Sequence, residues 1–292
     1  MERITPTLTR KIVQLPLPVT AAAVYGSWVR GTNAPDSDID LLVVSDKIHP
    51  KKHRRGKDIA TIRNYLSMDN PLDILLLTRE ECLSNFHNHN PLFLDIAWEG
   101  RILIDTDSFL GKCIDETRVY IEKKGIVKLP DGWKYPVEYR RATNLSRVSN
   151  EDFARAMLDD AHRDYKIGKI LTQEEFFDKA VYHFQQAGEK SVKAILICFG
   201  NFKKTHFVSD ALSRTLSTVE VDTSWKEKLA NIAQINKEIE PEVTWSRYPG
   251  MDHGSLWLPS LEYTHEDAFA VQEKIGIVLE TAGDFVSHWF IK

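Results

Sequence analysis

Residues 22–44 read AAVYGSWVRGTNAPDSDIDLLVV, and the rest of the chain is organised around this stretch. Val24 and Tyr25 belong to a short apolar strand that stops at Gly26. A loop rich in Gly, Asn, Pro, Asp and Ser follows, and residues 39–44 then form a second apolar strand. The stretch therefore predicts two strands that are joined by a polar turn.

Two acids, Asp38 and Asp40, stand at the start of the second strand. Because residues two apart in a strand share a face, both carboxylates point the same way while Ile39 and Leu41 point into a core. Carboxylates about 5 Å apart repel by about 3 kcal/mol at an effective dielectric of about 20, so a divalent cation, a shared proton or open solvent must offset the repulsion. Oxygen ligands without His or Cys favour magnesium or manganese over zinc. The plainer alternative is that Asp38 belongs to the turn and Asp40 is an ordinary exposed strand residue.

The surroundings of the two acids favour the metal site. Gly26 and Ser27 end a strand where a phosphate could meet backbone N–H groups and a hydroxyl donor. A further acid, Asp73, lies in the apolar run 72–77, which predicts another strand. Three carboxylates on neighbouring strands beside a phosphate-binding turn are the parts needed for metal-assisted nucleotidyl transfer.

This arrangement resembles the motif of the polymerase-β-like nucleotidyltransferases, in particular their minimal branch. The matching residues are Gly26-Ser27, then ten residues, then Asp38-Ile39-Asp40-Leu41. Arg30 and Gly31 also match the usual Gly-Ser-x-x-Arg-Gly form of that branch. Trp28 departs from the pattern, because the family often has Arg or Tyr at this position.

The resemblance implies a set of roles for these residues. Asp38 and Asp40 would bind Mg²⁺ or Mn²⁺, and Asp73 would be the third carboxylate, placed to activate the acceptor. The substrate would be ATP or another nucleoside triphosphate. Its phosphates would be seated by three residues: Gly26, Ser27 and, as a candidate electrostatic contact, Arg30.

Composition sets the outer bounds of the interpretation. At 292 residues, with 42% hydrophobic and 27% charged residues, the chain is long enough for two globular domains. A net charge of −4 argues against broad electrostatic capture of nucleic acid, although a local basic groove is compatible with it. Cys82, Cys113 and Cys198 stand far apart, which is typical of a reduced protein without disulfides or zinc. We find no signal-peptide or membrane-spanning pattern, so we expect a cytoplasmic protein without membrane contact.

Several elements are predicted around the motif. Thr78 to Glu81 is a capping box that opens a helix, and residues 101–105 form the last strand of the first sheet. The polar stretch 46–57 holds five Lys and Arg residues within its last seven positions, Lys51 to Lys57, in addition to Lys47. Such a run is usually a solvated loop; the alternative is contact with a triphosphate or a polyanionic acceptor.

The domain boundaries follow from a change of pattern. Residues 1–124 form the nucleotidyltransferase domain, and residues 125–150, with their Pro and Gly residues, have the composition of a connector. Residues 151–292 show helical periodicity only, strongest over 177–199, and predict an antiparallel bundle. Further helices are expected over 209–216, 225–239 and from Glu266 towards Ile291.

The helical half resembles the HEPN domain (higher eukaryotes and prokaryotes nucleotide-binding). The resemblance rests on residues 180–194, read as AVYHFQQAGEKSVKA, on Lys204-Thr205-His206 and on 246–250, read as SRYPG. A minimal nucleotidyltransferase followed by HEPN is a known pairing, found as separate toxin and antitoxin chains or as fusions. HEPN bundles often dimerise, so the resemblance also implies a homodimer through the bundle.

Many HEPN proteins are RNases that carry an Arg followed four to six residues later by His near the end of the last helix. The last predicted helix here contains no Arg, so His288 lacks that partner. Arg247 and His253 have the spacing, but Pro249 and Gly250 interrupt any helix between them. We therefore interpret Arg247 and the following Tyr as a loop anchored to the bundle; the alternative is contact with a nucleotide. His183 is expected to be a partly buried helix residue that makes one hydrogen bond, and His206 is expected to belong to the start of the next helix.

The sequence as a whole predicts an α+β protein: a mixed-sheet nucleotidyltransferase domain followed by an all-α HEPN-like bundle. The predicted reaction is metal-dependent transfer of a nucleoside monophosphate, AMP from ATP, to an unidentified small molecule, protein or RNA. Two alternatives belong to other classes. One is a fused toxin–antitoxin unit with RNase potential, and the other is a nucleotide-binding regulatory protein without turnover.

Overall fold

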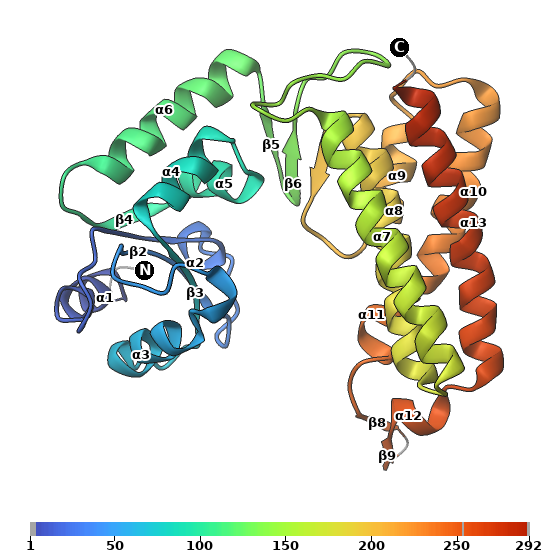
Figure 1. Cartoon of the computed structure of the whole chain (residues 1–292), viewed down its shortest axis with the longest axis horizontal. Helices are drawn as coiled ribbons and strands as arrows, with labels where there is room; N and C mark the ends of the chain where they lie inside the picture. The colour runs from blue at the N-terminus through green and yellow to red at the C-terminus, as the bar shows by residue number, and fades with distance from the viewer. Residues whose placement is uncertain (1–3, 253, 291–292) are drawn as a thin grey trace. The chain divides into compact units, whose positions relative to one another are not determined.

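The computed structural model describes residues 4–252 and 254–290, and the chain divides into two compact units (Figure 1). The first unit is Met1–Gly125 and the second is Ile126–Lys292. The segment predicted as a connector lies in the second unit apart from its first residue. Among the described residues, no helix combines the length and apolar character needed to cross a membrane.

A four-stranded sheet forms the centre of the first unit. Its strands are β1 (Ala21–Tyr25), β2 (Ile39–Val44), β3 (Leu72–Leu77) and β4 (Arg101–Asp105), in the order β3-β2-β1-β4. β1 is antiparallel to both β2 and β4, whereas β2 and β3 run parallel. The predicted mixed sheet is therefore confirmed, and β4 has the predicted bounds.

Helices bury both faces of this sheet. One face packs on α1 (Ile4–Val13) and α3 (Gly56–Leu66), and the other on α4 (Arg79–His87), α5 (Pro91–Glu99) and α6 (Phe109–Lys124). A strand with both faces covered needs apolar residues at successive positions, which explains the run of buried residues from Leu41 to Val44. The predicted capping box of α4 is confirmed, because the Thr78 hydroxyl and the Glu81 carboxylate each accept the other residue's backbone N–H.

The second unit is a helical bundle with small strands at its periphery. Its long helices are α7 (Asn150–Gln173), α8 (Phe177–Cys198), α9 (Ser209–Leu216), α10 (Thr223–Ile239) and α13 (His265–Trp289), with short α11 (Glu242–Trp245) and α12 (Pro259–Glu262). The central helix α8 packs on α7 and α13. Gly168 and Gly188 allow these close approaches, since a Cβ at Gly168 would lie 2.6 Å from the Phe184 ring and one at Gly188 would lie 2.6 Å from the Ile275 side chain of α13.

The prediction of helices alone after residue 150 is wrong in detail. β7 (Asn201–Lys203) joins β5 (Val127–Leu129) and β6 (Gly132–Lys134) in a three-stranded sheet, and β8 (Gly250–Asp252) pairs with β9 (Ser255–Trp257). Each of these strands has three residues, too few for a period-two pattern to appear in the sequence. Burial of Trp133 and Phe202 on the paired strands holds β6 and β7 against the bundle.

Glu240, at the end of α10, holds the start of α9. Its Oε1 accepts the backbone N–H groups of Val208 and Ser209, both at 2.7 Å, and the Ser209 hydroxyl at 2.8 Å. Asn236 donates to the same oxygen at 3.3 Å, and Glu240 is 5% exposed. The carboxylate therefore satisfies helix N-terminal donors that water cannot reach.

We expect Glu240→Ala to lower the free energy of unfolding of the second unit by about 3 kcal/mol, because several buried donors lose their acceptor. Glu240→Gln keeps one carbonyl oxygen and should cost less. Tryptophan fluorescence during urea unfolding measures this, since five of the seven Trp residues lie in the second unit. Equal midpoints for the Ala variant and the unmodified chain would contradict the assignment.

Candidate active site

The turn after β1 is built on Gly26. Its φ of 78° and ψ of −153° lie in a region that is open only to glycine. A Cβ at this position would lie 2.0 Å from Oδ2 of Asp40, so the Asp40 carboxylate rests against the Gly26 backbone. Backbone conformation and the acid's position thus both require glycine at residue 26, which begins the short helix α2 (Ser27–Arg30).

We expect Gly26→Ala to destabilise the first unit by about 2–4 kcal/mol and to displace Asp40, since strain and a clash act together. Gly31 gives the matched control. It also has a positive φ, 73°, but in the left-handed helical region and with open space where a Cβ would stand. Gly31→Ala should therefore cost only about 1–2 kcal/mol. Chemical unfolding of both variants measures their free energies of unfolding. Equal losses of stability would show that the contact with Asp40 does not contribute to the cost of Gly26→Ala.

Three polar residues form one row across the first sheet. Tyr25 of β1 pairs with Asp40 of β2, and Asp40 pairs with Asp73 of β3. Residues that are directly opposite in a sheet project to the same face, so the Asp40 and Asp73 carboxylates are neighbours. Burial, and then the negative charges of Asp40 and Asp73, raise the pKa of Tyr25. The tyrosine therefore stays protonated beside the acids at neutral pH.

Asp38 lies just before β2 and is exposed. Ile39 next to it pairs with Leu72, which places Asp38 at the same end of the sheet as Asp73. Asp38 also lines an open cavity of about 270 Å³, together with residues of the α3–β3 connection. Within residues 4–252 and 254–290, no three His, Cys, Asp or Glu side chains form a group that could hold a metal ion. The three-acid metal site therefore stays a prediction, and the register brings two of its members together.

The loop between Gly26 and Asp38 is fixed by side-chain hydrogen bonds. The Trp28 indole donates to the Ser37 carbonyl at 2.9 Å, and the Asn70 amide donates to the Pro35 carbonyl at 2.7 Å. The tryptophan that departs from the nucleotidyltransferase pattern thus holds the loop that leads into Asp38. The sequence alone did not reveal this role, because the bond spans nine residues of irregular chain.

Arg30 and Ser27 lie on α2 beside the turn. Arg30 pairs with Glu99 at the end of α5, and its side chain is 43% exposed. The ion pair orients the guanidinium and leaves part of it open to solvent. Ser27 is half-buried at the first position of α2.

The donor set of this site is compatible with magnesium or manganese. Asp40 and Asp73 supply carboxylate oxygens from adjacent strands, where side chains are about 5 Å apart. Hard oxygen ligands of this kind are preferred by Mg²⁺ and Mn²⁺. Asp38, just before β2, is the third acid that the sequence predicts as a ligand.

Sequence profiles of known families match both halves of the chain. The nucleotidyltransferase domain family matches residues 7–103, and the HEPN domain family matches residues 154–284. The chain is a nucleotidyltransferase domain joined to a HEPN domain. The first match contains the Gly26 turn and the Asp38, Asp40 and Asp73 positions. The second begins within α7 and ends within α13, and so covers most of the bundle.

Individual proteins resemble parts or most of the chain. A protein of Methanocaldococcus jannaschii, named as a candidate toxin (MJ1304), is 35% identical over 139 residues, which are 48% of this chain and 91% of that protein. The crystal structure of a nucleotidyltransferase-like protein from Exiguobacterium sibiricum matches 94% of this chain and 88% of its own, with 14% identity and a TM-score of 0.36. The crystal structure of an archaeal HEPN homologue matches 46% of this chain and 97% of its own, with 21% identity and a TM-score of 0.34.

The basic stretch of the nucleotidyltransferase domain lies away from the acids. It follows Val44 at the far end of β2, which is four residues, or about 13 Å along the strand, from Asp40 and from its partner Asp73. The stretch therefore begins at the opposite end of β2 from the acids, and its contact with a triphosphate stays an untested alternative. The parallel register of β2 and β3 sets the separation from Asp73, and it is not visible in the sequence.

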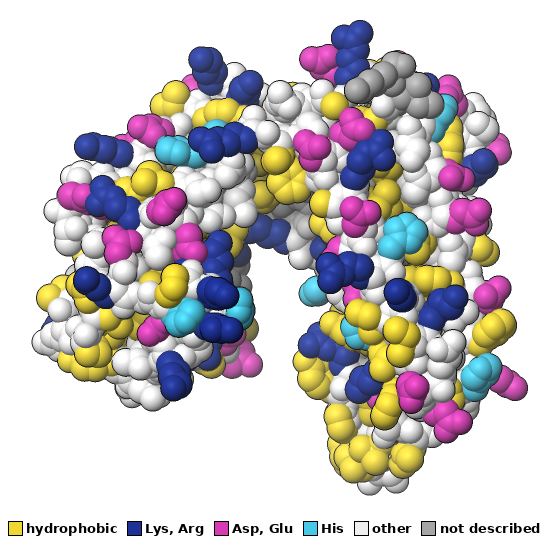
Figure 2. Space-filling model, viewed as in Figure 1, with side chains coloured by type: hydrophobic (Ala, Val, Ile, Leu, Met, Phe, Trp, Pro, Cys, Tyr) yellow, Lys and Arg dark blue, Asp and Glu magenta, His cyan; other side chains and the backbone are white. Residues whose placement is uncertain are grey.

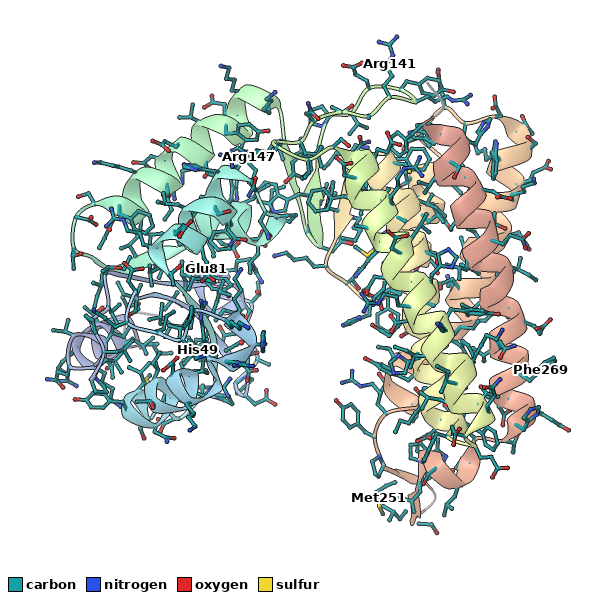
Figure 3. All side chains as sticks on the ribbon, in the orientation of Figure 1. His49, Glu81, Arg141, Arg147, Met251 and Phe269 are labelled. Carbon is teal, nitrogen blue, oxygen red and sulfur yellow. The ribbon has the colours of Figure 1, made fainter. Side chains whose placement is uncertain are left out.

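One member of the stretch, Arg55, is buried, with 1% of the residue exposed. All five of its guanidinium N–H groups find acceptors: the carbonyls of His49, Pro50 and Leu76 and both oxygens of Glu81, at 2.6–3.1 Å. Figure 3 labels His49 and Glu81, two of these partners. Arg55 thus connects the stretch to β3 and α4. The sequence did not distinguish this structural role of Arg55 from the roles of the charged residues beside it.

The Arg55–Glu81 pair predicts a pH dependence. Burial acts to raise the pKa of Glu81, but hydrogen bonds from Arg55 and Thr78 and the Arg55 charge outweigh it, so this pKa lies below its ordinary value. A depressed carboxyl pKa stabilises the fold above the unfolded-state pKa, and this contribution is lost as the pH falls through the folded-state pKa. We expect the unfolding midpoint of the unmodified chain to fall more between about pH 5 and about pH 3 than that of Glu81→Gln. Parallel curves for the two proteins would contradict the prediction.

The loop around Arg247 is anchored to the HEPN bundle, as predicted. The Arg247 guanidinium lies 5.2 Å from the centre of the Tyr182 ring on α8 and 4.8 Å from that of Tyr248. Lys179 donates to the Ser246 carbonyl at 3.2 Å and to that of Arg247 at 3.4 Å. Cation–π contacts and main-chain bonds together hold the loop on α8.

The histidines of the HEPN domain have varied surroundings. His183 forms a hydrogen bond with Asp164 at 3.0 Å, which confirms the prediction for it. His206 was expected at the start of a helix, but it precedes α9 and pairs with buried Glu189 at 3.0 Å. His253, the spacing partner of Arg247, lies outside the described residues.

His288 has an arginine neighbour that its own helix does not supply. Arg140, from the segment before α7, donates to the His288 carbonyl at 2.9 Å. Asp222 lies 3.7 Å from the His288 ring and 3.9 Å from the Arg140 guanidinium. Only the fold brings these three residues together, because they come from separate parts of the chain.

Proposed function

We propose that this protein transfers a nucleoside monophosphate, AMP from ATP, to an acceptor that carries a hydroxyl or phosphate group. The observation that carries the proposal is the register of Asp40 with Asp73 beside a glycine turn, within a domain of the nucleotidyltransferase family. The acceptor would be a small molecule, a protein or an RNA end.

Different residues would bind the metal ions and the phosphates of the triphosphate. Asp38 and Asp40, with Asp73, would hold one or two Mg²⁺ or Mn²⁺ ions; when bound, the metal supplies positive charge that neutralises the triphosphate. Gly26 and Ser27 would seat the β- and γ-phosphates, and the exposed part of Arg30 would add an electrostatic contact. These contacts would orient the α-phosphorus towards the acceptor.

Asp73 would act on the acceptor itself. As the acceptor oxygen forms its bond to the α-phosphorus, the bond between the α-phosphorus and the oxygen leading to the β-phosphorus breaks and pyrophosphate leaves. The acceptor proton passes to the Asp73 carboxylate, which is exposed at the start of β3 and can release it to water. Exposure of Asp73 supports this role, because an acceptor can approach it from solvent.

The test uses ATP labelled at the α-phosphate, the full chain, Mg²⁺ and a cell extract. We expect label to move from the α-phosphate of ATP to a new species with release of equimolar pyrophosphate. With ATP labelled at the γ-phosphate, the label should appear in pyrophosphate and not in that species. Chelation of divalent ions should stop the transfer. Calorimetric ATP binding without any labelled product would instead support a regulatory protein without turnover.

The candidate toxin from Methanocaldococcus jannaschii supports a second function, a fused toxin–antitoxin unit with RNase potential. Arg247 is the strongest candidate for a residue that takes part in RNA cleavage. Its side chain is exposed and is held by the rings of Tyr182 and Tyr248. Incubation of the full chain with total RNA tests this function. Cleavage that is lost in Arg247→Ala would favour it, and intact RNA would exclude it under those conditions.

A further inference from the structure

The stretch 46–57 of the nucleotidyltransferase domain presents positive charge without ion-pair partners. Figure 2 shows Lys and Arg side chains gathered along one edge of this unit. Five cations of the stretch have no ion-pair partner among the residues that the structure describes: Lys47, Lys51, Lys52, Arg54 and Lys57. The chain as a whole carries a net charge of −4, so the stretch is positively charged within a protein that is negatively charged overall.

The stretch has a fixed conformation. Buried Arg55 binds two of its carbonyls, and residues Lys52–Arg54 form a 3₁₀ turn. Asp46 accepts the Arg79 backbone N–H at 2.9 Å, and Asp58 accepts that of His49 at 3.1 Å. The flanking acids are thus used in internal hydrogen bonds. A solvated loop needs no such fixation, whereas a binding surface benefits because less entropy is lost on binding.

The surroundings of the cations decide what class of ligand fits them. They are spread from Lys47 to Lys57, which suits an extended polyanion better than one phosphate group. The stretch contains no Phe, Tyr or Trp on which bases could stack, and its two apolar neighbours, Ile48 and Ile59, pack into the core beneath. No large exposed hydrophobic side chain is found from residue 46 to residue 58, so nothing is available to enter a lipid layer.

We infer that residues 46–57 form a docking surface for the phosphodiester backbone of a nucleic acid strand, bound without regard to base sequence. Lys and Arg side chains that contact phosphates release counterions, which makes such binding strongly dependent on salt. The surface lies at the opposite end of β2 from Asp40, so binding needs neither the triphosphate nor the acids.

The experiment measures fluorescence anisotropy of a labelled single-stranded RNA of about 20 nucleotides, and of DNA of the same sequence, with the full chain in EDTA and without ATP. We expect a Kd of about 10⁻⁶–10⁻⁵ M at low salt. With five contacts, the logarithm of the affinity should fall with the logarithm of salt concentration with a slope of about −3.5. The triple variant K51Q/K52Q/K57Q should bind about tenfold more weakly or worse, with a slope of about −1.4.

A matched control is provided by α7 in the HEPN domain. Arg163, Lys166 and Lys169 also form no ion pair in the described part of the chain. R163Q/K166Q/K169Q removes the same charge and should leave the affinity within about twofold of the unmodified value. D38N/D40N should also bind RNA normally, which separates this inference from the proposed transferase reaction.

Three outcomes would overturn the inference. They are no binding of RNA or DNA at low salt, an equal loss in the α7 control, and tighter binding to vesicles containing phosphatidylserine than to either strand. The equal loss would mean that only net charge matters, and the vesicle result would assign the surface to a membrane. Because the substituted side chains lie at the surface, loss of folding is not expected, and circular dichroism checks it.

Discussion

Replacing Asp38 and Asp40 together by Asn is expected to reduce pyrophosphate release from ATP by at least about 100-fold, or about 3 kcal/mol of transition-state stabilisation. Asn keeps the size of Asp and removes the negative charge that would hold a divalent cation. The Asp40 side chain would still lie against Gly26, so the fold should survive. A coupled assay for pyrophosphate, run with Mg²⁺ and the acceptor-containing extract, gives the rate.

The control for this double variant is Asp36→Asn with Asp69→Asn. Each of these acids precedes one of the two strands that carry the proposed ligands. This control removes the same charge near the site and should change the rate by less than about twofold. Unchanged turnover in D38N/D40N would refute the proposed roles of both acids. Loss of turnover in both double variants would point to net charge instead.

Replacing Arg55 by Ala is expected to lower the free energy of unfolding of the first unit by about 3 kcal/mol. Removal of one member of a buried ion pair leaves the other charge without its partner. The three carbonyls bound by Arg55 also lose their hydrogen-bond donors. The value lies at the lower end of the usual range because the Glu81 side chain is still 21% exposed. Hydrogen exchange resolved by peptide measures the effect, with faster exchange expected over residues 46–57 and in β3.

Arg54→Ala is the matched control for Arg55→Ala. Arg54 is adjacent and exposed, and it forms no ion pair with the residues that the structure describes. Its removal should leave exchange in β3 unchanged. If Arg55→Ala also left the exchange of 46–57 unchanged, the stretch would not depend on this anchor, and the fixed docking surface would lose its physical basis.

Local pattern predicted most of the secondary structure. The bounds of β4 and α9 agree with the sequence-based ranges, and the Thr78 capping box is present as expected. These features depend on residues within one or two turns of one another, where periodicity and capping chemistry dominate. The short strands β5 to β9 were missed because three residues carry too little pattern.

The candidate site was predicted only in its components. The spacing of Gly26, Asp38 and Asp40 is a local property, and it was sufficient to indicate the nucleotidyltransferase family. The pairing of Asp40 with Asp73 depends on which strands adjoin and in what register, which is a property of the whole sheet. The roles of Trp28 and Arg55 depend in the same way on contacts with segments distant in the chain or irregular in shape.

The sequence by itself determined the family of each half, the order of the two domains and the position of the glycine turn after β1, because these follow from short motifs and from hydrophobic periodicity. The tertiary structure decided which acids are neighbours, why residue 26 must be glycine, and which of two adjacent arginines is buried. Arg54 and Arg55 carry the same charge and the same propensities, so the sequence cannot separate them. Only the position of Glu81 and of the backbone carbonyls around the guanidinium of Arg55 makes its burial favourable.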